Sequence, residues 1–220
     1  MPNRIRKSWR ILLVAAGIGA VIPRPASASS LGLDFVPGPG LSKVCSGELA
    51  PGCTGGWGFA VNSTVDVVGL GVWDEGADGL VEGHEVGLWT AGGVLLTSAL
   101  VTNAGSAVGS TGPGQWLFTP IASLTLAPGS YVIGAAYSAN DLGDPVRFNT
   151  IASLSPDIAL ADAMIMTGAA GLTFPTTIAT NLNPGLFGPN LEIVPTPEPA
   201  SILLMATGIS ALVACRRRRN

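Results

Sequence analysis

The 220-residue sequence predicts an all-β protein, an antiparallel β-sandwich or jelly-roll-like ectodomain between two apolar termini. Between the termini, short segments alternate polar and apolar residues with the period of two that is typical of strands, and none shows a clear helical period. Thirty glycines and seventeen prolines punctuate the chain. Frequent turn residues with no helices between them indicate a series of antiparallel strands.

The expected strands follow one another at short intervals. They are Ser63–Asp74, Glu85–Thr90, Val94–Thr102, Gln115–Thr119, Ile121–Leu126 and Ser130–Ser138. The turn Ala91-Gly92-Gly93 should join the second and third strands as a hairpin. Pro128 and Gly129 form a turn before the last strand. Residues 139–190 hold short apolar pieces between Asn, Asp, Pro and Gly, and predict longer loops with a few closing strands.

Charge is distributed unevenly along the chain. Nine of the eleven Lys and Arg lie before residue 28 or after residue 215, whereas all fourteen Asp and Glu lie between residues 29 and 199. Only Lys43 and Arg147 accompany these acids, so the formal net charge of −3 hides a middle segment at −12. Such an acidic segment argues against nucleic acid or anionic membrane surfaces as partners.

The N-terminus has the three parts of a secretory signal peptide. Residues 1–10 are basic, residues 11–22 are apolar, and residues 26–28 form an A-x-A cleavage site. The apolar core is shorter than the roughly 20 residues that a membrane span needs. We therefore expect the secretion machinery to export the chain, with a signal peptide at residues 1–28 and a mature chain that begins near Ser29.

The C-terminus carries a second apolar segment, Ser201–Cys215. As a helix it would rise about 22 Å, short of a hydrocarbon core of roughly 30 Å, but arginine snorkelling and local thinning absorb such a mismatch. A basic cluster follows, which should stay in the cytoplasm. The cluster consists of Arg216, Arg217, Arg218 and Arg219. Before the span, Pro197 and Pro199 hold Glu198 in an extended stretch that a processing enzyme can grip.

The Pro197-Glu198-Pro199 string, the short span and the arginine cluster, in this order, resemble the PEP-CTERM sorting signal. We assign this signal to residues 194–220. The resemblance implies a bacterium with an outer membrane, an exosortase in the inner membrane that recognises and removes the tail, and a role linked to exopolysaccharide and biofilm production. The alternative is a plain membrane anchor that is never cut.

A second resemblance covers about residues 55–193. The strings VWDEGADGL, HEVGLWTAGGVLL, APGSYVIGAAY, LTFPTT and FGPN, in that order, resemble an extracellular domain of PEP-CTERM proteins catalogued as the domain of unknown function DUF4082. This resemblance implies a β-sandwich and no established activity. Residues 29–54 would then form an N-terminal extension.

Cys45 and Cys53 enclose a seven-residue loop within this extension. In an exported protein two nearby cysteines more often form a disulfide than a metal pair, so we expect them to be bonded to each other. Cys215 belongs to the tail and is not their partner.

The stretch DEGADGLVEGHE, residues 74–85, holds five acids and the only histidine. It matches part of the calcium-loop pattern D-x-[DN]-x-[DN]-G-x5-E. Gly76 offers no side-chain oxygen at the third position, and the flanks are predicted strands, which argues against an EF-hand. A calcium loop on the sandwich and an acidic, solvated hairpin connection remain as alternatives. The candidate calcium ligands are Asp74, Asp78, Glu82 and Glu85.

Catalytic signals are weak, because no G-x-S-x-G elbow accompanies His84 and no carboxylate pair or thiol stands out. We therefore expect no enzyme, no catalytic residue and no cofactor besides calcium. The expected function is that of a structural protein of the cell surface or exopolysaccharide matrix. The alternatives are a carbohydrate-binding module and a polysaccharide-acting hydrolase. A binding module would stack sugars on tryptophans, although tryptophans on strands more often belong to the core. These tryptophans are Trp57, Trp73, Trp89 and Trp116.

Overall fold

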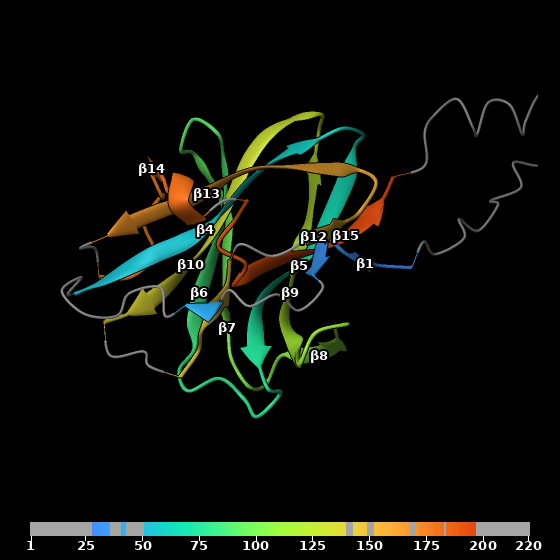
Figure 1. The fold of residues 1–220 in the computed structure, drawn as a ribbon. Helices are drawn as coiled ribbons and strands as arrows, with labels where there is room; N and C mark the ends of the chain where they lie inside the picture. The colour runs from blue at the N-terminus through green and yellow to red at the C-terminus, as the bar shows by residue number, and fades with distance from the viewer. Residues whose placement is uncertain are drawn as a thin grey trace, which may run out of the picture.

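The computed structural model describes residues 28–35, 41–42, 51–139, 143–148, 152–167, 170–182 and 184–196. Within these ranges the protein is built from antiparallel strands, and two large sheets share one hydrophobic core (Figure 1). A single 3-10 turn, η1 (Thr180–Leu182), is the helical element of the described residues. The predicted all-β, antiparallel fold is therefore confirmed. The two predicted terminal helices lie outside the described residues.

The first sheet has five strands in the order β1, β15, β5, β9, β8. Their bounds are β1 (Ser30–Leu31), β15 (Pro189–Pro195), β5 (Val65–Glu75), β9 (Gly114–Leu126) and β8 (Ser106–Gly109). The two segments predicted at 115–119 and 121–126 form the single strand β9. Pro120 does not break it, because Pro120 lies opposite Gly69 where the register shifts, and a bulge tolerates a missing N–H.

The second sheet has six strands in the order β14, β13, β4, β10, β6, β7. Their bounds are β14 (Thr177–Ile178), β13 (Ile158–Thr167), β4 (Gly52–Val61), β10 (Gly129–Ser138), β6 (His84–Thr90) and β7 (Leu95–Val101). The predicted hairpin is confirmed as β6 and β7, and Gly93 takes the left-handed φ of 85° that its turn requires. The boundary placed at residue 55 falls inside β4.

Two small sheets complete the described fold. Strand β3 (Leu41–Ser42) pairs with β11 (Val146–Arg147), and β2 (Leu33–Phe35) pairs with β12 (Ala152–Leu154). The segment expected to hold loops and a few closing strands thus contains β11 to β14 and part of β15. One of these, β13, is ten residues long and pairs with β4 along most of its length.

Strand β4 was not predicted, because its sequence GCTGGWGFAV is rich in glycine, which is depleted in strands. The glycines are needed where backbones and rings approach closely. Gly56, Gly134 and Gly87 are register neighbours across β4, β10 and β6. A Cβ on Gly56 would lie 2.0 Å from the Ile133 carbonyl oxygen, and one on Gly87 would lie 2.5 Å from the Trp89 ring.

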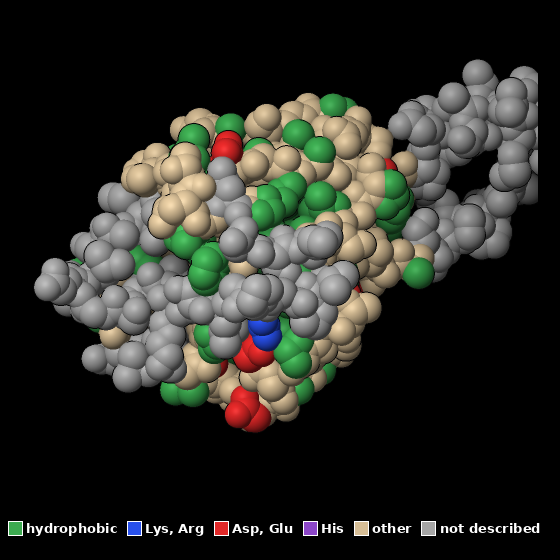
Figure 2. All heavy atoms as spheres, in the orientation of Figure 1, with side chains coloured by type: hydrophobic (Ala, Val, Ile, Leu, Met, Phe, Trp, Pro, Cys, Tyr) green, Lys and Arg blue, Asp and Glu red, His purple; other side chains and the backbone are tan. Residues whose placement is uncertain are grey.

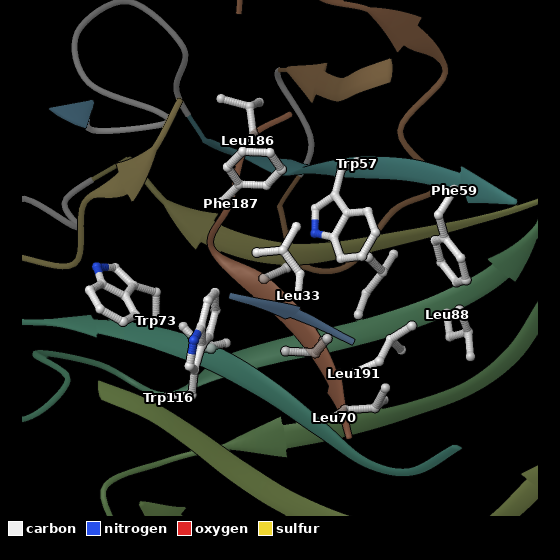
Figure 3. Close-up of a cluster of buried hydrophobic side chains, with 14 of the residues drawn as sticks. Leu33, Trp57, Phe59, Leu70, Trp73, Leu88, Trp116, Leu186, Phe187 and Leu191 are labelled. Atoms are coloured by element: carbon white, nitrogen blue, oxygen red, sulfur yellow. The ribbon is translucent and has the colours of Figure 1, made fainter. Parts of the chain in front are cut away.

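The core between the two sheets is dense and aromatic (Figure 3). Its labelled side chains are at most 1% exposed, and they come from both sheets and from the segments beside them. They are Leu33, Trp57, Phe59, Leu70, Trp73, Leu88, Trp116, Leu186, Phe187 and Leu191. The Phe35 ring packs edge-on against the rings of Trp73 and Trp116, with centroids 4.6 and 5.4 Å apart.

Replacing Gly56 by alanine should destabilise the fold by about 3 kcal/mol or more, because the new methyl group meets a backbone carbonyl that cannot move aside without distorting β10. Denaturant unfolding of the full chain in detergent would measure the loss. Gly109→Ala is the matched control, since a Cβ at Gly109 meets nothing within 4 Å, and its change should stay within about 0.5 kcal/mol. Equal stability of the two variants would contradict the close-approach account.

Candidate functional site

The acidic stretch, residues 74–85, runs from the end of β5 to the start of β6, and the Asp74 side chain binds back to this stretch. Asp74 is 1% exposed. Its carboxylate accepts hydrogen bonds from the Gly79 backbone N–H at 3.2 Å and from Gln115 Nε2 at 2.8 Å. Gly76, Ala77 and Gly79 have positive φ angles of 84°, 56° and 98°, which turn the chain back toward this acceptor. Asp74 therefore serves the loop as an internal hydrogen-bond acceptor.

The other candidate calcium ligands point to different partners. Glu82 Oε1 accepts a hydrogen bond from the Ser138 N–H at 3.1 Å, Glu85 accepts one from Ser98 Oγ at 3.2 Å, and Asp78 is exposed. Over the described ranges, no group of three or more His, Cys, Asp or Glu side chains is placed to hold a metal ion. The structure thus keeps the four candidates in one stretch without bringing them to one point.

His84 makes the contact that the sequence did not reveal, with Asp144 sixty residues away. The ring is fully buried, and Asp144 is 6% exposed. Nδ1 lies 2.9 Å from the Ala136 carbonyl oxygen, and Nε2 lies 3.0 Å from Asp144 Oδ2. A carboxylate and a carbonyl oxygen accept hydrogen bonds, so each ring nitrogen of His84 lies within hydrogen-bond distance of an acceptor.

Asp144 ties three segments together. Its carboxylate also accepts the backbone N–H groups of Val81 and Glu82, at 2.9 and 3.3 Å to Oδ2. Burial raises the pKa of Asp144, but the hydrogen bonds from His84, Val81 and Glu82 and the charge of His84 outweigh this effect and leave the pKa below its ordinary value of 3.8. The pair therefore holds the acidic loop, the start of β6 and the 143–148 segment in one arrangement.

A hollow of about 350 Å³ lies beside this pair. Glu82 and Glu85 line it together with Leu100, Tyr137 and Ser138. The Ser138 hydroxyl is buried, and no hydrogen-bond partner for it is found within the described part of the chain. The hollow offers the carboxylate oxygens of Glu82 and Glu85, which can accept hydrogen bonds from hydroxyl or amino groups of a ligand.

The four tryptophans proposed as sugar platforms are all buried, with at most 3% exposed. Trp57 Nε1 donates to the Pro189 carbonyl oxygen at 2.8 Å, and Trp73 Nε1 donates to Glu75 Oε2 at 2.7 Å. Trp116 lies in the aromatic cluster, and Trp89 is covered by Phe174 at 5.9 Å between ring centroids. The stacking role is therefore wrong in this fold, and the alternative of core packing holds for all four.

Surface charge in the described residues is almost entirely acidic. Arg147 is their one Lys or Arg, it is 7% exposed, and its Nε donates to Glu75 Oε2 at 2.9 Å. On the face drawn in Figure 2, scattered acidic side chains and one small basic area are visible. Cys53 is disulfide-bonded, and its predicted partner Cys45 lies outside the described residues.

The chain enters and leaves the described body at one edge. Strands β1 and β15 lie side by side there, with Ser30 opposite Ile193 (Figure 1). The last described residue, Thr196, is still bound to the body, since its N–H and its Oγ1 both donate to the Thr64 carbonyl oxygen, at 3.4 and 2.5 Å. The predicted processing motif, Pro197 to Pro199, and the predicted arginine cluster, Arg216 to Arg219, lie outside the described residues.

The residues that follow the all-β body at this edge match a known family model. Residues 195–219 match the family model of the PEP-CTERM protein-sorting motif. This confirms the resemblance predicted for the tail. The motif implies export, sorting at a membrane and processing by an exosortase.

Two further comparisons return nothing, since no curated protein and no solved structure matches this chain. The DUF4082-like resemblance of residues 55–193 stays a prediction. None of the helices in the described ranges combines the length and apolar character needed to cross a membrane.

Replacing Asp144 by alanine should cost about 3–5 kcal/mol of unfolding free energy, because it removes the carboxylate that the buried His84 ring and two backbone N–H groups contact. Asp78→Ala, at an exposed carboxylate, should change stability by less than about 0.5 kcal/mol. Denaturant midpoints of the two variants measured side by side provide the check.

The His84–Asp144 pair also makes the stability of the fold depend on pH in the acidic range. Because the pKa of Asp144 is lowered in the folded state, its contribution is present above the ordinary value of 3.8 and is lost as the pH falls through the lower folded value. The wild-type protein should therefore lose stability more steeply than Asp144→Ala as the pH falls from 3.8 toward that lower folded value. Parallel slopes would show that another group dominates.

Proposed function

We propose that this protein is a non-catalytic structural component of the bacterial cell surface or exopolysaccharide matrix. It is exported, held at the inner membrane by its tail, and released when an exosortase removes that tail. The single observation that carries this proposal is the PEP-CTERM motif at residues 195–219, which begins at the final residue of β15.

The organisation of the body supports a structural role. The one histidine is fully buried against Asp144, and therefore out of reach of a substrate. The large aromatic side chains fill the core, and the polar groups that bridge segments are mostly satisfied within the chain. We assign no catalytic residue.

Binding of an exopolysaccharide chain is the second candidate, and the hollow beside Glu82 and Glu85 supports it in place of the tryptophans. Its carboxylates are suited to accept hydrogen bonds from sugar hydroxyl groups. Retention of the protein on immobilised exopolysaccharide, reduced by Glu85→Ala and unchanged by Asp78→Ala, would favour this role. Equal retention of both variants would contradict it.

The intact mass of the native protein, taken from membrane and secreted fractions of its own cells, tests the sorting proposal. We expect a secreted species that begins near Ser29 and ends close to the Pro197–Pro199 stretch. Its loss of the apolar segment and arginines follows from removal of the tail. A single membrane species that still carries Arg216 to Arg219 would identify a permanent anchor and overturn the proposal.

A further inference from the structure

The folded body holds the chain up to the residue before the sorting tripeptide. Pro195 pairs with Val65 at the start of β5, and Thr196 is bound to the Thr64 carbonyl oxygen through both its N–H and its hydroxyl. Pro197, the first residue of the Pro-Glu-Pro string, follows immediately. An enzyme that takes hold of this string therefore meets the end of the five-stranded sheet.

The distance to the membrane is short as well. Four residues, 197–200, separate Thr196 from Ser201, where the predicted span begins. A fully extended chain covers at most about 3.3–3.6 Å per residue, so the five steps from Thr196 to Ser201 reach roughly 17 Å. Part of that length lies within the headgroup region. The body and a membrane-embedded enzyme are consequently in contact or nearly so.

The end of β15 is the part of the body that can give way. Among the described residues, β1 pairs with β15 only at Ile193 and Glu192, and the pairing of residues 194 and 195 that the structure describes is with β5. Pro195 is exposed and has no N–H to donate. Ile193 and Leu191, by contrast, are fully buried. Fraying of residues 194–196 is therefore a low-cost local opening, and it stops at Ile193.

We propose that detachment of residues 194–196 from β5 is the gate for removal of the tail. This inference rests on the proposed function, because it concerns the same processing step. The detached residues lengthen the accessible stretch on the body side of Pro197, and an extended substrate segment can then enter the enzyme. The enzyme breaks one peptide bond, a nucleophile such as water takes the acyl group, and the tail leaves with a new amino terminus.

Insertion of a flexible Gly-Ser segment between Thr196 and Pro197 tests the gate in cells that produce the full chain. Pulse-labelling followed by mass analysis gives the rate of tail removal. The insertion supplies the free length that fraying otherwise provides, so we expect removal to become faster, by roughly two- to tenfold for the one or two hydrogen bonds that no longer have to open.

A point variant separates the gate from a simple effect of length. Thr196→Val removes the hydroxyl bond to Thr64 and should also speed removal, by up to about tenfold. Thr119→Val is the matched control, since it removes the Thr119 Oγ1 bond to the Leu100 carbonyl oxygen at a position on β9 opposite Leu70, away from the exit, and should leave the rate unchanged.

The outcomes distinguish failure of the gate from failure of the proposed function on which the gate rests. If the wild-type chain keeps its tail throughout, the proposed function fails and the gate with it. If the wild-type chain is processed but neither Thr196→Val nor the insertion changes the rate, the function stands and the gate is wrong. Slower removal after the insertion also overturns the gate, and would show that the enzyme reads the sheet end itself.

Discussion

The pairing of β15 on both of its sides is the interaction on which the rest of the described structure depends. It joins β1 to β5, and its Asn190 side chain exchanges hydrogen bonds with the Leu33 backbone, at 3.0 Å to N and 2.6 Å to O. Its Pro189 carbonyl accepts the indole N–H of Trp57 from the other sheet. The last strand of the described residues thus links their first segment, the centre of one sheet and the core of the other.

Three carboxylates that accept hydrogen bonds from neighbouring segments, those of Asp34, Asp74 and Asp144, hold the loops in place. Asp34 accepts hydrogen bonds from Ser110 and Thr111 and so ties β2 to the connection between β8 and β9. Burial raises the pKa of Asp34, but the hydrogen bonds from Ser110, Thr111, Phe35 and Trp116 lower it more, and the net pKa is below its ordinary value. Asp74 and Asp144 also accept hydrogen bonds from backbone N–H groups in their own loops. Several acids of this chain are therefore internal acceptors, and its acidic character is only partly a property of its surface.

The parts of the fold that were predicted from the sequence are those with local signals. Strands such as β5, β6 and β10 alternate over several residues, and the turn at Gly93 has its own chemistry. Strand β4 was missed because its glycines are required by the close approach of neighbouring strands, and the sequence pattern of β4 alone does not reveal those neighbours. The same reason explains the site: the sorting tail is a linear signal and was readable, whereas the His84–Asp144 pair joins residues that only the fold brings together. The tryptophans were ambiguous, since burial decides their role.

The neighbouring ends of the body have a mechanical consequence. Ser30 and Ile193 face each other on antiparallel strands, so a force that pulls the two ends apart acts across the strands. Such a load separates β1 from β15 one pair at a time, and β1 contributes only two residues. Tension between the termini is thus resisted weakly, whereas tension along the strands would have to shear whole ladders at once. A matrix that bears load through this protein must hold it by its faces.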